Sequence, residues 1–102
     1  MFADIETDLY YSSVSIAEIS VKHRVHPEEM PITGVEAVGF MSKLVCAPLD
    51  FKAQHASTMD ALPLYHRDPF DRMLIAQAKA EGMKLLSHDR QFPQYGDFVI
   101  AV

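Results

Sequence analysis

Residues 65–82, YHRDPFDRMLIAQAKAEG, contain the clearest helix signal of the chain. Pro69 suits the first turn of a helix, Asp68 is its natural N-cap, and Gly82 is a typical C-terminal stop. The predicted inner stripe consists of Leu74, Ile75 and Ala78. Two aspartates, Asp68 and Asp71, therefore lie at the start of an apolar helix, where they either begin the helix or hold a ligand.

Outward from this helix, predicted strands and helices alternate. Strands are predicted over 8–13, 44–49, 83–89 and 97–102, and further helices over about 15–24, 33–44 and 51–62. The predicted N-caps are Ser13 or Ser15, Thr33 and Asp50, with Ser15 and Glu18 forming a capping box. Pro48 is expected to end the second strand. This alternation indicates an α/β fold with a largely parallel sheet, in which ligands gather beyond the carboxyl ends of the strands.

Composition limits the classes of protein to consider. The chain has 102 residues, 49% of them apolar, and we interpret residues 1–102 as a single domain. No apolar run is long enough to span a membrane and no signal peptide is visible, so we expect a cytoplasmic protein. The net charge of −5 argues against a broad basic nucleic-acid surface, but not against a nuclease with a metal centre. The single cysteine, Cys46, excludes an internal disulfide and is expected in the core.

Acidic residues follow two of the predicted strands. Glu18 comes after the first strand and Asp89 directly follows the strand residues KLLSH, 84–88, so both are expected at one edge of a parallel sheet. Crowded carboxylates repel one another unless a cation compensates them, and Mg²⁺ or Mn²⁺ does so with oxygen ligands. Each acid also has a structural explanation. Asp68 can be a plain N-cap, Asp71 a favourable charge at a helix start, Glu18 part of a capping box and Asp89 a turn residue.

Basic residues and histidines lie beside these acids in the sequence. They are His66, His88, Arg67, Arg72 and Arg90. No histidine pair has the spacing of a helical zinc motif, so we interpret the histidines as surface groups or neighbours of the acidic site. Arg72 is interpreted as a solvated partner of a carboxylate, with phosphate contact as the alternative.

Two stretches resemble a known family. SSVSIAEISVK and HRDPFDRMLIAQAKAEGMKLLSHDRQFPQYG look like parts of a PIN domain, and more narrowly like the VapC-like ribonuclease toxins of bacterial toxin–antitoxin pairs. The resemblance implies a three-layer α/β/α fold and an endoribonuclease that uses Mg²⁺ or Mn²⁺. It assigns Glu18, Asp71 and Asp89 as catalytic metal ligands. Asp68, Arg72 and Ser87 are the residues that it implies around them.

The N-terminal segment departs from that family, which opens with an apolar strand ending in an aspartate and a helical crossover. MFADIET resembles the end of this crossover, and neither Asp4 nor Asp8 can replace the aspartate, because parallel neighbours need a crossover of about a dozen residues. We therefore expect a PIN-like domain that lacks its first strand and helix. Two strands would then lose a neighbour, which favours a homodimer or a strand-swapped assembly.

Two functions remain open from the sequence. The first is a metal-dependent endoribonuclease of the toxin type, and the second is a non-catalytic module that binds an antitoxin or itself. The family implies an RNA substrate and a cognate antitoxin, whose helix would occupy an apolar groove. VGFMSKL, residues 38–44, is a candidate for that groove, although we predict its apolar side chains in the core. The predicted inner positions of this helix are Val35, Val38, Met41 and Leu44.

Overall fold

The computed structural model describes residues 9–87 and 89–102. Its strands are β1 (Tyr10–Ser12), β2 (Ala47–Leu49), β3 (Leu85–Ser87) and β4 (Val99–Ala101). Its α-helices are α1 (Ser13–Val25), α2 (Gly34–Lys43), α3 (Ala53–Thr58) and α4 (Pro69–Glu81), with short 3₁₀ helices η1 (Met59–Ala61) and η2 (Phe92–Tyr95). Helices and parallel strands confirm the α/β fold class. The interpretations of MFADIET, Asp4, Asp8 and His88 fall outside the described residues.

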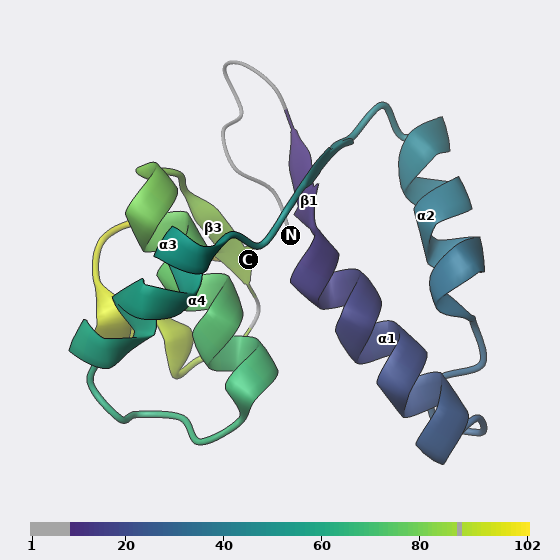
Figure 1. Cartoon of the computed structure of the whole chain (residues 1–102), viewed down its shortest axis with the longest axis horizontal. Helices are drawn as coiled ribbons and strands as arrows, with labels where there is room; N and C mark the ends of the chain where they lie inside the picture. The colour runs from purple at the N-terminus through teal and green to yellow at the C-terminus, as the bar shows by residue number, and fades with distance from the viewer. Residues whose placement is uncertain (1–8, 88) are drawn as a thin grey trace.

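The described strands form two parallel pairs instead of the one sheet that we predicted. β1 pairs with β2, with Tyr10 opposite Ala47, and β3 pairs with β4, with Leu85 opposite Val99. Figure 1 shows β1 beside the α1–α2 hairpin and β3 beside α3 and α4. Within residues 9–87 and 89–102, β1 and β3 each have a single partner strand.

The helix α4 forms as predicted and supplies the centre of the core. The Asp68 carboxylate accepts a hydrogen bond from the Phe70 N–H at 2.9 Å, and Gly82 ends the helix with a left-handed φ of 66°. The side chains of Ile75 and Ala76 are fully buried, together with residues of β3, η2 and β4. The predicted inner stripe of Leu74, Ile75 and Ala78 is therefore confirmed.

Buried polar groups connect α4 to the segment that follows β2. Gln77, which is 2% exposed, donates from Nε2 to the carbonyl oxygens of Leu49 at 3.4 Å and Asp50 at 3.1 Å. The Ser13 hydroxyl accepts a hydrogen bond from the Phe51 N–H at 3.0 Å. These bonds hold the end of β2 against both α4 and the start of α1. As a result α1 and α4, which are far apart in the sequence, are in contact.

The start of α1 differs from the prediction. The helix begins at Ser13, and the side chain of Ser12 caps it by accepting a hydrogen bond from the Val14 N–H. The predicted capping box of Ser15 and Glu18 is therefore wrong. Glu18 lies one turn inside the helix, so its carboxylate is available for other contacts.

The inward face predicted for α2 is also wrong. Thr33 and Glu36 form the capping box of this helix, but Val35 is 84% exposed and Leu44 is 61% exposed. The buried residues are Gly34 and Ala37. A Cβ atom at Gly34 would lie 2.1 Å from the Ser20 hydroxyl of α1, so this face of α2 has small residues because the two helices approach closely.

The segment after α2 corrects three further predictions. β2 is largely exposed instead of buried, and Pro48 lies inside it, opposite Tyr11, instead of ending it. A proline is tolerated there because an edge strand does not need every N–H group for pairing. The N-cap of α3 is Lys52 instead of Asp50. Cys46 is buried, as predicted.

Candidate metal centre

The three acids singled out by sequence line one cavity of about 370 Å³. Glu18 reaches it from α1, Asp71 from the first turn of α4, and Asp89 from the loop after β3. The other lining residues are Lys22, Leu74, Leu85, Leu86, Ser87 and Phe92. The cavity thus combines three carboxylates and one ammonium group with an apolar floor. It lies where α1 meets the core built around α4.

Local hydrogen bonds fix the positions of two aspartates. The Ser87 hydroxyl, at the end of β3, accepts a hydrogen bond from the Asp89 N–H at 3.1 Å. Asp89 Oδ1 in turn accepts one from the Gln91 N–H at 2.8 Å, so Asp89 is a turn residue as well as a cavity residue. Asp68 caps α4, and its carboxylate also lies within 4.8 Å of carboxylate oxygens of Glu18 and Asp71.

A lysine partly compensates this group of acids. Lys22 Nζ lies 2.7 Å from Glu18 Oε2, one turn along α1. This hydrogen bond raises the pKa of Lys22, and the charges of Asp68 and Asp71 add to the effect. The ammonium group is therefore held in its charged form at the wall of the acidic cavity.

Asp71 is the acid that the site perturbs most clearly. Burial raises the pKa of its carboxyl group above the ordinary value, and the charges of Asp68, Glu18 and Asp89 raise it further. Both causes disfavour the ionised form, because the carboxylate loses water and faces like charges. A divalent cation removes this penalty by supplying compensating charge, so the donor set fits a hard ion such as Mg²⁺ or Mn²⁺.

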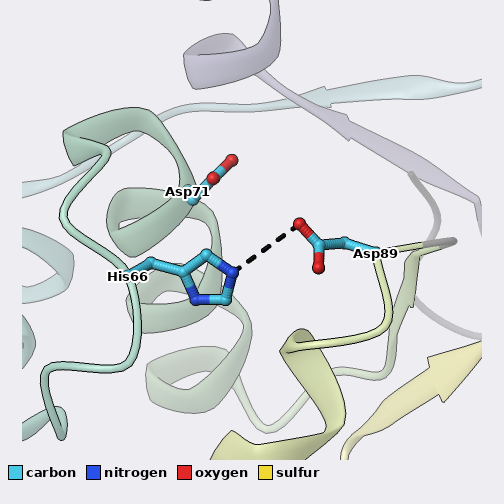
Figure 2. Close-up of side chains that lie close together, drawn as sticks. All are labelled: His66, Asp71 and Asp89. Atoms are coloured by element: carbon cyan, nitrogen blue, oxygen red, sulfur yellow. Dashed lines mark ion pairs between the residues drawn. The ribbon is translucent and has the colours of Figure 1, made fainter.

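Asp71 belongs to a second close group, with His66 and Asp89. Ligand atoms of these three residues lie within 4.8 Å of one another. Figure 2 shows the imidazole of His66 facing the carboxylate of Asp89, with Nε2 3.6 Å from Oδ2, and Asp71 above them. The side chain of His66 is only 9% exposed, so of the two interpretations it is a neighbour of the acidic site and not a surface group. The one signal in the sequence for a place of His66 near the acids was its position two residues before Asp68.

Arg72 does not take the role that the sequence suggested. Its guanidinium group donates to the carbonyl oxygens of Pro63 at 2.9 Å, Met59 at 3.2 Å and Leu62 at 3.4 Å. Within the described part of the chain no carboxylate forms an ion pair with it, and it does not line the cavity. Arg72 instead ties the η1 segment to α4, because η1 and the loop after it need donors for their free carbonyl groups.

Residues 2–97 match the PIN domain family, which covers nearly the whole chain. The chain belongs to the PIN domain family. PIN domains are nuclease-type modules and generally depend on divalent metal ions, which agrees with the acidic cavity described above. No curated protein and no solved structure matches the chain significantly. In the described segments, 9–87 and 89–102, no helix has both the length and the apolar character needed to cross a bilayer.

Proposed function

We propose that this PIN domain is a metal-dependent endoribonuclease of the VapC-like toxin type. The observation that carries the proposal is the meeting of Glu18, Asp71 and Asp89, from three separate elements, at one cavity. Structural needs alone explain Asp68 as a cap and Asp89 as a turn residue, but they do not explain why Asp71 accepts burial next to other acids. A bound cation explains that arrangement.

In this proposal Glu18, Asp71 and Asp89 would hold Mg²⁺ or Mn²⁺. When bound, such an ion would help to generate the attacking hydroxide and would stabilise negative charge on the phosphate. Asp68 and Ser87 position the ligands, since Asp68 begins α4 and Ser87 holds the backbone of Asp89. Lys22, at the same cavity, is placed to contact a phosphate oxygen once a cation has taken over the compensation of Glu18.

Cleavage of RNA by the purified chain tests this proposal. Total RNA is incubated with the protein in Mn²⁺, in Mg²⁺ and in EDTA, and the products are separated by electrophoresis. Glu18→Gln, Asp71→Asn and Asp89→Asn should each reduce the rate about 100-fold or more, since a metal ligand contributes several kcal/mol to the barrier. Glu29→Gln and Asp60→Asn are matched controls, because both residues are exposed and outside the cavity, and they should cleave like the wild type. Equal cleavage by all variants would reject the nuclease.

A non-catalytic interaction module is the second candidate, and the surface of α2 favours it. Val35, Phe40 and Leu44 are 84%, 48% and 61% exposed, and Val45 just beyond the helix is 87% exposed. Several exposed apolar side chains along one helix favour a surface that binds another protein. A chain that binds no divalent ion and cleaves no RNA, yet forms a stable dimer in sedimentation analysis, would favour this candidate.

The proposed nuclease has two kinds of partner and one compartment. RNA is the proposed substrate, and a cognate antitoxin is the proposed inhibitor, with a helix placed on the exposed apolar surface of α2. A homodimer or strand-swapped assembly is the proposed oligomeric state, and the cytoplasm is the proposed location. Co-expression with a candidate antitoxin, followed by co-purification and inhibition of cleavage, tests the antitoxin as a partner.

A further inference from the structure

His66 has a buried ring nitrogen without a hydrogen-bond partner. The side chain is about nine-tenths buried. Its Nε2 atom is inaccessible to solvent and has no hydrogen-bond partner within the described part of the chain. Burying such a nitrogen unpaired costs free energy, so a group of this kind calls for an explanation. The nearest charged atom is Asp89 Oδ2 at 3.6 Å, which is too far for a good hydrogen bond.

The same distance suits two ligands of one metal ion. Two donor atoms that each lie about 2.1 Å from an ion are about 3.0–3.4 Å apart at octahedral or tetrahedral angles. The 3.6 Å between His66 Nε2 and Asp89 Oδ2 is close to this range, and a ligand oxygen of Asp71 lies within 4.8 Å of both. In Figure 2 the imidazole of His66 and the carboxylate of Asp89 face each other, and Asp71 lies beside this pair.

The surroundings of the imidazole hold it in this orientation. The Tyr95 hydroxyl oxygen lies 3.3 Å from the ring nitrogen Nδ1 of His66. It also accepts a hydrogen bond from the main-chain N–H of His66 at 3.0 Å. The ring meets the edge of Phe92 at a centroid distance of 5.0 Å and stacks on Tyr95 at 5.7 Å. If Nδ1–H donates to the Tyr95 oxygen, the lone pair of Nε2 faces Asp71 and Asp89. Histidine ligands of metals are usually oriented by such a bond to the other ring nitrogen.

We propose that His66 is a nitrogen ligand of the metal centre, together with Asp71 and Asp89, and that it makes the site prefer Mn²⁺ over Mg²⁺. This inference rests on the metal site of the proposed function. Mg²⁺ takes oxygen ligands almost exclusively and keeps several waters, whereas imidazole suits first-row transition metals. Three carboxylates alone would not distinguish the two ions in this way.

Titration calorimetry with MnCl₂ and with MgCl₂ tests the preference in the absence of RNA. His66→Gln should weaken Mn²⁺ binding about 10-fold or more and change Mg²⁺ binding less than about threefold. Tyr95→Phe keeps the ring and removes only the orienting hydroxyl, so it should weaken Mn²⁺ binding several-fold and leave Mg²⁺ binding unchanged. His26→Gln is the matched control, because His26 is exposed in the loop after α1.

Pulsed electron paramagnetic resonance of bound Mn²⁺ gives a readout that is independent of folding changes in the variants. The wild type should show the modulation of a directly bound ¹⁴N nucleus, and His66→Gln should lose it. Absence of nitrogen modulation in a wild type that binds Mn²⁺, or equal losses of both ions in His66→Gln, would overturn the role of His66 and leave the proposed nuclease intact. A wild type that binds neither ion would refute the metal centre itself and this inference with it.

Discussion

Replacing Asp71 by asparagine should stabilise the metal-free protein while it disables the site. Asp71 is partly buried, and its carboxylate oxygens lie within 4.8 Å of those of Glu18 and Asp68. Asparagine has nearly the same shape and removes the charge. The gain therefore comes from relieved repulsion and desolvation rather than from altered packing.

The separation of the charges sets the size of this effect. Two like charges 4.8 Å apart repel by about 0.9 kcal/mol in water and about 3.5 kcal/mol at an effective dielectric constant of 20. Solvent reaches this site, so the lower value applies to each of the three neighbours Glu18, Asp68 and Asp89, and the ammonium group of Lys22 offsets about one of these repulsions. Asp71→Asn also loses a favourable charge at the start of α4, about 0.5 kcal/mol. The net gain is about 1 kcal/mol, which for a domain of this size raises the Tm by about 4–8 °C.

The pH dependence of this gain has a definite sign. Because the pKa of Asp71 is raised above its ordinary value of 3.8, the folded protein binds a proton more tightly than the unfolded chain does. The wild type therefore loses stability as the pH rises from that ordinary value through the raised pKa. Asp71→Asn lacks this loss, so its advantage should be full above the raised pKa and should vanish below about pH 4.

Urea unfolding in EDTA, followed by circular dichroism, measures the increase in the free energy of unfolding of Asp71→Asn. Asp60→Asn is the exposed control, and its free energy of unfolding should stay within about 0.5 kcal/mol of the wild-type value. Asp68→Asn keeps an N-cap of equal quality and removes a second charge of the group, so it should also stabilise. In Mn²⁺ the wild type should be more stable than Asp71→Asn, because ion binding stabilises only the wild type. A lower stability of Asp71→Asn in EDTA would refute the reasoning.

Three further predictions concern other residues. Lys22→Gln should tighten Mn²⁺ binding several-fold in titration calorimetry, because its ammonium competes with the ion for Glu18; an unchanged affinity would contradict this. Gln77→Ala should lower the free energy of unfolding by about 1–3 kcal/mol in urea titrations, since two main-chain carbonyl groups lose their donor. His55→Ala should lower it by about 3 kcal/mol in the same assay, because the fully buried ring pairs with Glu81 at 2.5 Å; a loss below 1 kcal/mol would count against this role.

Prediction from sequence succeeded where local signals were complete. The helix α4 has a capping aspartate, a proline in its first turn, an apolar stripe and a terminal glycine, and each signal acts within a few residues. Thr33 and Glu36 likewise define the start of α2. The parallel strand pairs were indicated by the alternation of strands and helices.

Prediction failed where a partner surface decided the outcome. The valines and leucine of α2 have helical spacing, but α1 contacts the face with Gly34 and Ala37, so the larger side chains remain exposed. Sequence periodicity shows that a helix has an apolar face, but it does not show what covers that face. Arg72 was mistaken for a site residue for a similar reason, since the carbonyl groups that it binds come from a loop about ten residues earlier.

The sequence by itself indicated Glu18, Asp71 and Asp89 as candidate ligands, and it determined the helix that presents Asp71 and the membership of the PIN family. Only the tertiary structure decided that Glu18 does not cap its helix, that Lys22 pairs with it, and that a buried nitrogen of His66 lies close to Asp71 and Asp89. The physical reason is that caps and turns depend on neighbours in the chain. The charge and solvation of a cavity depend on elements that meet only after folding.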